Sequence, residues 1–371
     1  MTGTKMPSLE AIQACSDFEQ VARTVTPAYA WDYIEGGEKD TISLNEAAFE
    51  TLLIRPHVLA DVSSIDLRCS VLGSPCQAPL YLTSIAKGGL VSQEGEHAFV
   101  RAAHRFGVPY IVPTISTTPH EDIFGAAALG QGLPYQFYLL GDNEDSIVKL
   151  KTAMRCGCTA VVITVDNNAP RKGALFASTQ ATSNVFPDPT FTWGRLEEVM
   201  ALLPPGLPVY FKGIQTAEDA IRAVQKGARG IVVSNHGGRA CGGCRSALAS
   251  LEEVTACLRA KRLLGTIEIL FDGGVRCGLD VFKALCLGAT GVGVGRPYYW
   301  ASAAFGEDGV VAALGLLSSE LRHTMAQAGA PKLAGLSPLM LCRAATPHLP
   351  LRLSWDSDEV LLEADRVDSK L

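Results

Sequence analysis

From Ala78 onward, short apolar runs alternate with longer amphipathic stretches along the chain. Within the longer stretches the apolar side chains recur at helical spacing, as at Ile147, Leu150 and Met154. Apolar runs that alternate with helices predict a parallel sheet built from β–α units. The runs that we predict as strands are Pro79–Thr83, Tyr110–Thr114, Tyr135–Leu139, Ala160–Val165, Val209–Lys212, Gly230–Ser234, Glu268–Phe271 and Gly291–Val294.

Eight such units close into a (β/α)8 barrel of the TIM type, an α/β fold. An open doubly wound sheet is the alternative, and the regular eightfold repetition argues against it. The sequence predicts three parts: an N-terminal helical segment at 1–77 that packs on the barrel, the barrel at 78–350, and a tail at 351–371. A long proline-containing connection at 167–195 leaves the end of the fourth strand, where barrel enzymes place functional lids.

Composition narrows the function. Of 371 residues, 47% are hydrophobic and 19% are charged, which is typical of a folded protein with a core. The net charge is −6 and no basic block is present, so nucleic acid is not an expected partner. No apolar stretch approaches the roughly 20 residues of a membrane span. The 11 cysteines indicate reduced thiols in an intracellular protein.

No metal site is predicted. Cys241 and Cys244 form a C-x-x-C pair, but a structural zinc site needs four ligands. The chain ends in Ser369-Lys370-Leu371, which is the address that the peroxisomal import receptor recognises. We therefore expect a peroxisomal location.

Polar side chains stand where the predicted strands end, and in a barrel these ends meet on one face. Each of them alone could cap a helix or satisfy the backbone of its loop, but the whole set predicts an active site. The set comprises Gln136, Tyr138, Thr164, Asp166, Lys212, Ser234, His236 and Arg239.

The last two strands predict a phosphate site. Asp272-Gly273-Gly274-Val275-Arg276 follows the seventh strand, and Gly295-Arg296-Pro297 follows the eighth. Loops at these two places commonly bind phosphate in barrels. Glycines let backbone N–H groups approach phosphate oxygens, and the two arginines add charge-assisted contacts.

The ordered motifs Ser-Asn-His236-Gly-Gly-Arg239, Asp-Gly-Gly-Val-Arg276 and Gly-Arg-Pro297 resemble the FMN-dependent 2-hydroxy acid oxidase and dehydrogenase family. Glycolate oxidase, lactate oxidase, mandelate dehydrogenase and the flavin domain of flavocytochrome b2 belong to this family. The resemblance covers the chain from about Asp32-Tyr33 to about Gly329. It implies FMN as the cofactor, a small 2-hydroxy acid as the substrate and a homo-oligomeric assembly.

The resemblance also implies roles. His236 corresponds to the catalytic base, Asp166 to the carboxylate that stabilises its imidazolium, and Tyr138 to a group beside the substrate hydroxyl. Tyr33 and Arg239 correspond to the residues that hold the substrate carboxylate. The implied flavin contacts are Ala86, Thr114, Gln136, Thr164, Lys212, Ser234, Asp272, Gly273, Gly274, Arg276, Gly295 and Arg296.

Three departures from the family concern the substrate. Leu175 stands where the family has a second substrate arginine, and Arg171 or Lys172 could take its place. The lid is shorter than in typical members. Ile115 replaces the tryptophan of glycolate oxidase beside the substrate. These changes predict a pocket that prefers a bulkier hydroxy acid to glycolate.

Two alternatives stay open at this point. One is an enzyme of the same fold that acts on another substrate in a specialised pathway, and the other is a catalytically silent FMN-binding protein. Retention of the whole polar set argues against the silent protein. No cytochrome domain precedes the barrel, so molecular oxygen is the expected acceptor. The sequence is compatible with departure of the α-hydrogen either as a hydride to the flavin or as a proton to His236.

Overall fold

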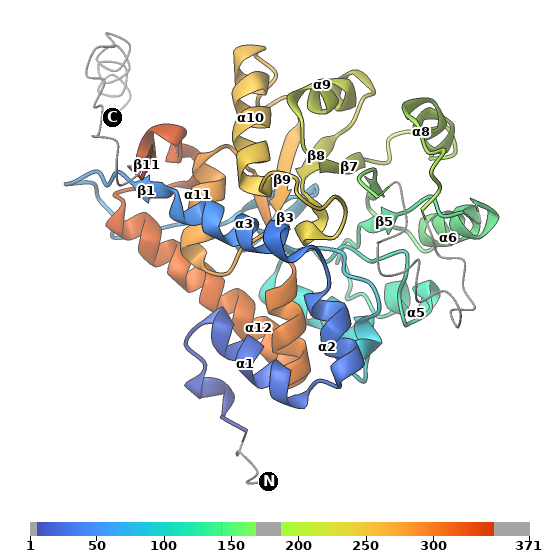
Figure 1. Ribbon diagram of the computed structural model, residues 1–371, viewed down its shortest axis with the longest axis horizontal. Coiled ribbons are helices and arrows are strands. Elements are labelled where there is room, and N and C mark those ends of the chain that lie inside the picture. Colours follow the sequence, from blue (N-terminus) through green and yellow to red (C-terminus); the bar gives the residue numbers. More distant parts are fainter. Residues whose placement is uncertain (1–5, 142, 168–186, 345–371) are drawn as a thin grey trace.

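The computed structural model describes residues 6–141, 143–167 and 187–344. Its centre is a parallel sheet in the order β4-β10-β9-β8-β7-β6-β5, surrounded by helices (Figure 1). The strands are β4 (Leu80–Leu82), β5 (Tyr135–Phe137), β6 (Val161–Thr164), β7 (Val209–Ile214), β8 (Gly230–Val233), β9 (Glu268–Asp272) and β10 (Gly291–Val294).

An eighth segment joins the two outer strands of this sheet. Tyr110 bridges to Leu82 of β4 and Val112 bridges to Tyr135 of β5, both in parallel sense. Because β4 also pairs with β10, the sheet closes on itself. The predicted (β/α)8 barrel is therefore confirmed, and the open sheet is excluded. The expected second strand, Tyr110–Thr114, is reduced to these two bridges.

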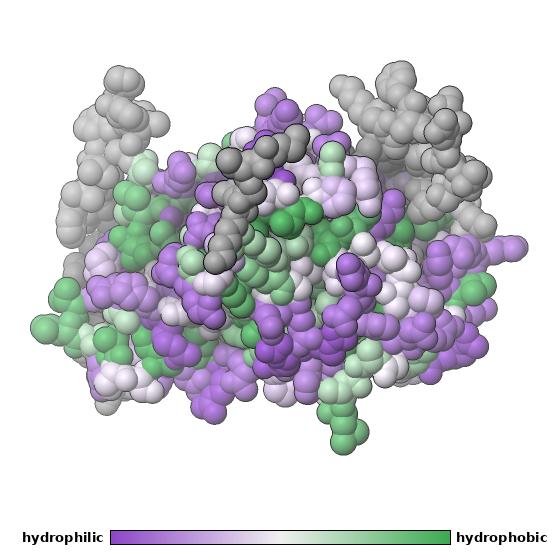
Figure 2. All heavy atoms as spheres, turned by 90° about the horizontal axis from the view of Figure 1, so that it is seen from below, coloured by the Kyte–Doolittle hydropathy of each residue, from purple (hydrophilic) through white to green (hydrophobic). Residues whose placement is uncertain are grey.

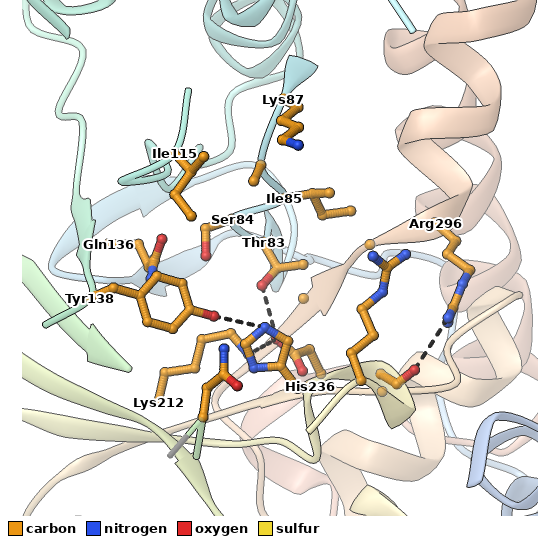
Figure 3. Close-up of a pocket in the computed structure, with 18 of the residues that line it drawn as sticks. Thr83, Ser84, Ile85, Lys87, Ile115, Gln136, Tyr138, Lys212, His236 and Arg296 are labelled. Atoms are coloured by element: carbon orange, nitrogen blue, oxygen red, sulfur yellow. Dashed lines mark hydrogen bonds and ion pairs between the residues drawn. The ribbon is translucent and has the colours of Figure 1, made fainter. Parts of the chain in front are cut away.

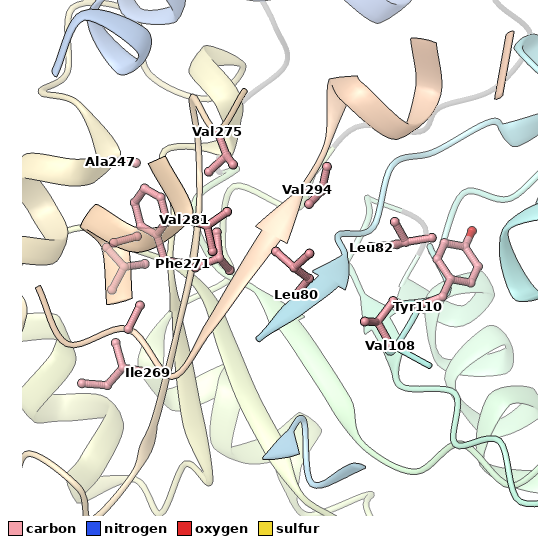
Figure 4. Packing of buried hydrophobic residues seen from close by; sticks show 14 of the residues in the cluster. Leu80, Leu82, Val108, Tyr110, Ala247, Ile269, Phe271, Val275, Val281 and Val294 are labelled. Carbon is pink, nitrogen blue, oxygen red and sulfur yellow. The ribbon is translucent and has the colours of Figure 1, made fainter. Parts of the chain in front are cut away.

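Alternation along the strands explains how one sheet supports two cores. Tyr81, Val162, Tyr210, Val232 and Leu270 point into the barrel and form one cluster. Their sequence neighbours point outward, where they pack against the helices in a second, larger cluster (Figure 4). Strands that are buried on both faces read as continuous apolar runs, which is why they are visible in the sequence.

The helices outside the barrel follow the strands in turn. They are α4 (Glu96–Phe106), α5 (His120–Gly125), α6 (Asn143–Arg155), α8 (Trp193–Met200), α9 (Ala217–Gln225), α10 (Ala247–Ala260), α11 (Gly278–Cys286) and α12 (Arg296–Gln327). At α9, Thr216 caps the start of the helix by accepting a hydrogen bond from the Asp219 N–H, and Gly227 follows its end with φ +77°.

The segment before the barrel is not only helical. It contains α1 (Cys15–Val25), α2 (Ala28–Glu35) and α3 (Lys39–Glu50), but also β1 (Leu52–Ile54), which pairs with β11 (Leu341–Arg343). A hairpin of β2 (Cys69–Val71) and β3 (Ser74–Cys76) supplies Val71, Leu72 and Cys76 to the interior cluster of the barrel. The expectation of helices and loops alone was wrong here because three-residue strands leave almost no periodicity to detect.

One helix among the described residues, α12, is long and apolar enough to cross a membrane by length and composition. Its backbone is broken at Phe305 and Gly306, and it packs against α1, α4 and α11. We therefore interpret it as a core helix. The face that Figure 2 shows mixes hydrophobic and hydrophilic residues.

Candidate active site at the carboxyl ends of the strands

A cavity of about 430 Å³ lies where the carboxyl ends of the strands meet. This volume falls in the range of small-molecule sites, about 300–1,000 Å³. Predicted site residues that line it are Tyr33, Ala86, Ile115, Gln136, Tyr138, Lys212, His236, Arg239, Asp272, Gly273, Gly274, Arg276, Gly295 and Arg296. Figure 3 shows several of them pointing toward a common space.

His236 is held from both sides of its ring. Its Nδ1 lies 2.9 Å from Asp166 Oδ1, and its Nε2 lies 2.8 Å from the hydroxyl of Tyr138. The Asp166 side chain is almost completely buried. A buried carboxylate at Nδ1 keeps the proton on that nitrogen, which leaves Nε2 as the basic atom. The imidazole is thus oriented to accept a proton at Nε2, on the Tyr138 side.

The backbone around His236 takes an unusual path. His236, Gly237 and Gly238 have φ values of +60°, +61° and +79° in succession. Positive φ is uncommon for a residue with a side chain, and such strain concentrates at functional sites. Added to Gly238, a Cβ would lie 2.9 Å from Ile42 of α3. The N-terminal segment therefore packs directly on the turn that presents His236.

A glycine makes room for Asp166. Gly213 interrupts the register of β7 with φ +102°, and a Cβ on it would lie 2.3 Å from both Cβ and Cγ of Asp166. Strand β7 thus bulges where the carboxylate that orients His236 has to fit.

Lys212 forms a buried ion pair. Its Nζ lies 3.0 Å from Asp272 Oδ2 and donates to Ser234 Oγ at 2.8 Å. Ser234 in turn donates to Asp272 and accepts from the His236 N–H at 3.0 Å. Burial alone would raise the pKa of Asp272, but Lys212 and the hydrogen bonds of Ser234 and Thr83 outweigh burial and lower it. Lys212 therefore has a compensated positive charge beside the cavity.

Gln136 is fixed by two threonines behind the cavity wall. Its Oε1 accepts from the Thr114 N–H at 3.1 Å, and its Nε2 donates to Thr164 Oγ1 at 2.9 Å. Thr114 Oγ1 donates to the Gln136 carbonyl at 2.5 Å. With its amide oriented in this way, Gln136 presents a defined hydrogen-bonding edge to a ligand.

The opposite end of the cavity is positively charged. Arg296 is 8% exposed, and burial together with the nearby Arg239 and Arg276 lowers its pKa to about 10. Within the described residues its guanidinium donates to three backbone carbonyls, those of Ile34, Gly36 and Gly237, and to no carboxylate.

Burying a cation without an anion beside it costs free energy. A phosphate group fits this end of the cavity, where Gly273, Gly274 and Gly295 also line the wall. The residues present therefore suit the phosphate of FMN.

Tyr33 lies close to two cations at the cavity. The Cζ of Arg239 and the Nζ of Lys87 each lie 5.4 Å from its ring centroid. Arg239 also donates to the Ile34 carbonyl, which ties it to α2. These positions are compatible with binding of a carboxylate.

The remaining predicted site residues lie behind the residues that line the cavity, or outside the residues that the structure describes. Asp166, Thr114, Thr164 and Ser234 contact lining residues but do not line the cavity themselves. Arg171, Lys172 and Leu175 lie outside the described residues, as do Ser369, Lys370 and Leu371.

Sequence reasoning missed Gly213, Lys87 and Asn45. Asn45 exchanges amide hydrogen bonds with Asn235, at 2.9 and 2.7 Å, and so ties α3 to the end of β8. A single asparagine on a helix gives no signal of such a long-range pair. For Gly213, its place directly after Lys212 inside a strand was the available signal, because glycine in a strand often marks a bulge.

The geometry can be compared with known proteins. Residues 22–175 and 167–343 match the FMN-dependent dehydrogenase family. A peroxisomal (S)-2-hydroxyacid oxidase of Arabidopsis thaliana is 35% identical over 353 residues, which covers 87% of this chain and 94% of that protein. A 4-hydroxymandelate oxidase of Amycolatopsis orientalis is 37% identical over 345 residues, with 85% and 94% covered.

Among solved structures, a flavocytochrome b2 mutant with benzoylformate superimposes with a TM-score of 0.86 and 32% identity. The match covers 97% of this chain and 93% of that one.

Proposed function

Since this chain belongs to the FMN-dependent dehydrogenase family, we propose that its cavity oxidises a 2-hydroxy acid to the 2-oxo acid. It is an FMN-dependent oxidoreductase, and the flavin supplies the two-electron acceptor for the α-carbon. The observation that carries the proposal is the Asp166–His236–Tyr138 arrangement inside a cavity whose other end suits a phosphate. A catalytically silent FMN-binding protein would need none of the side chains of Asp166, His236 and Tyr138.

In this mechanism the residues of the chain position the acid and move one proton. Arg239 and Tyr33 hold the substrate carboxylate. Tyr138 lies beside the hydroxyl, and His236 takes up a proton at Nε2. Asp166 stabilises the resulting imidazolium through the 2.9 Å contact at Nδ1. Hydride and carbanion routes both require a neutral His236 before turnover.

The test is anaerobic reduction of the purified flavoprotein by a panel of 2-hydroxy acids. Bleaching of the yellow flavin by at least one 2-hydroxy acid supports the proposal. Bleaching by other substrates only would favour an oxidoreductase of a different substrate class. A yellow protein that no compound bleaches would favour a silent FMN-binding protein.

For the acceptor we propose molecular oxygen, reduced to hydrogen peroxide. The support is the relationship to oxidases such as the Arabidopsis and Amycolatopsis proteins. Stoichiometric peroxide during turnover is the expected result. Slow reaction of the reduced enzyme with oxygen but fast reaction with a quinone or a cytochrome would identify a dehydrogenase instead.

Peroxisomal import through Ser369-Lys370-Leu371 is also proposed, supported by that sequence and by the peroxisomal Arabidopsis relative. A fluorescent protein fused to the N-terminus should appear in puncta and become diffuse when the last three residues are deleted. A diffuse signal from the intact fusion would contradict import.

A homo-oligomer is proposed as well. Val58 and Leu59 are 83% and 102% exposed, next to each other at a positive-φ turn, which suits a contact between copies. Light scattering of the protein as it elutes from a size-exclusion column measures its molar mass. The mass of a monomer at micromolar concentration would contradict the proposal.

A further inference from the structure

Lys87 differs from the other cations around the cavity. Lys212 pairs with Asp272, Arg276 pairs with Glu46 at 2.5 Å, and Arg296 donates to carbonyls. Within 6–141, 143–167 and 187–344, no oxygen lies at hydrogen-bond or ion-pair distance from Lys87 Nζ, and its one close partner is the face of Tyr33. Figure 3 shows its amino group directed toward the other labelled residues.

The backbone holds Lys87 in this position at a cost. Its φ is +64°, a left-handed conformation that lysine seldom adopts, and its N–H donates to the Ile115 carbonyl at 3.0 Å. Next to it, the N–H of Gly88 donates to the buried Glu96 at 2.8 Å. The carboxylate of Glu96 also accepts from Thr117 and Thr118, both at 2.9 Å. Strain that the surroundings maintain is typical of functional positions.

The same carboxylate thus fixes the Lys87 loop against the loop that carries Ile115. The first loop presents a cation to the cavity and the second presents an apolar wall. Arg239 approaches the Tyr33 ring as closely as Lys87 does. Both cations therefore lie close to the ring of Tyr33 in the same cavity, where an anion that accepts from the Tyr33 hydroxyl would have two cations near it.

We propose that Lys87 is a second carboxylate-binding residue of the active site, which shares the α-carboxylate of the substrate with Arg239. The inference rests on the proposed function, because only an acid substrate supplies this carboxylate. Lys87 thereby determines specificity for an anionic substrate and takes no part in the proton transfer at His236. Because Lys87 is an exposed residue, its contribution should weaken as ionic strength rises.

The test compares Lys87→Gln with Lys87→Arg in the FMN-loaded enzyme, with Lys151→Gln as a control at an exposed lysine away from the cavity. Loss of one charge-assisted contact should raise KM for 2-hydroxy acids about tenfold, with little change in kcat. Lys87→Arg should restore most of the affinity. FMN content should stay at the wild-type value in all three variants.

A binding measurement separates this inference from the proposed function. Titration with a 2-oxo acid, followed by the flavin absorbance spectrum, gives Kd without turnover, and Lys87→Gln should raise it by the same factor. An unchanged Kd and KM would overturn the inference while leaving the function intact. Loss of FMN from Lys87→Gln would also overturn it, because Lys87 would then hold the cofactor.

Substrate choice provides the last arm of the test. If Lys87→Gln weakens 2-hydroxydicarboxylic acids but not 2-hydroxymonocarboxylic acids, Lys87 binds a distal carboxylate and the proposal is wrong. If wild-type enzyme bleaches with no 2-hydroxy acid but Lys87→Gln still binds 2-oxo acids more weakly, the function fails and the carboxylate site stands.

Discussion

The two ends of the cavity balance their charges differently. At the His236 end, the polar side chains are already paired within the protein: His236 lies against Asp166, and Lys212 lies against Asp272. At the Arg296 end, burial and two further guanidinium groups lower the pKa of a cation whose acceptors, in the part of the chain that the structure describes, are carbonyl oxygens. The groups at the first end therefore have their partners without a ligand, whereas Arg296 at the second end would gain a counter-charge from one.

This difference suits the two ends to two functions, proton transfer at the His236 end and cofactor binding at the Arg296 end. Pre-paired groups keep a fixed geometry before the substrate arrives, which is what proton transfer requires. A buried cation without a carboxylate partner among the described residues, as Arg296 is, would be stabilised by an anion, which favours tight retention of a phosphate-bearing cofactor. Changes at the first end should thus affect rate, and changes at the second should affect cofactor occupancy.

The largest effect is expected from His236→Ala. Removal of a general base typically costs about 10²–10⁴ in rate, so anaerobic flavin reduction should slow by that factor while FMN content is retained. His104→Ala, at an exposed histidine away from the cavity, is the matched control. Flavin reduction at the normal rate in His236→Ala would disprove the proposed role.

Gly213→Ala tests whether the carboxylate behind His236 needs the bulge in β7. A new Cβ would stand 2.3 Å from Asp166 Cβ and Cγ, so Asp166 must move. Misplacement by about 1 Å can cost about 10² in rate, and we expect a loss of that order in kcat.

Gly227→Ala is the matched control, because Gly227 also has positive φ, +77°, but has open space at its Cβ. Both variants carry backbone strain, and only Gly213→Ala should lose activity out of proportion to its loss of thermal stability. Equal activity in the two variants would show that the bulge does not matter for catalysis.

At the other end, Arg296→Ala should weaken FMN retention. Charge-assisted hydrogen bonds contribute about 1.5–3 kcal/mol, which corresponds to roughly ten- to hundredfold in Kd. Arg222→Ala, at an exposed arginine on α9, is the control.

Wild-type protein stripped of FMN offers a second measurement at this end. Its melting temperature should rise when inorganic phosphate is added, and less so in Arg296→Ala. Failure of phosphate to stabilise wild-type apoprotein would contradict an anion site at this end.

The sequence predicted the barrel and most of the lining because both leave local signals. Doubly buried strands are apolar runs, and the polar residues that follow them converge on one face whatever the details of packing. Asn45 acts through a partner that is distant in sequence, and no local pattern indicates such a pair; Gly213 has the local signal of a glycine at a strand, but not the identity of the distant Asp166 for which it makes room. Lys87 was missed because a single exposed lysine looks like ordinary surface until the fold brings it over Tyr33.

The smallest expected effect concerns substrate size. Ile115 lines the cavity with Leu140 and Pro187, so an apolar substituent on the α-carbon would be buried against them. Burial contributes about 0.8 kcal/mol per methylene, or roughly fourfold in affinity. The shared carboxylate contacts are the same for every 2-hydroxy acid and cancel in the comparison. Wild-type kcat/KM should therefore increase from glycolate to hydroxy acids with larger apolar or aromatic side chains, and Ile115→Trp should reverse this order by filling the space. The highest kcat/KM for glycolate in the wild-type enzyme would refute the prediction. If Ile115→Trp leaves the preference unchanged, the space beside Ile115 is not the cause of the preference.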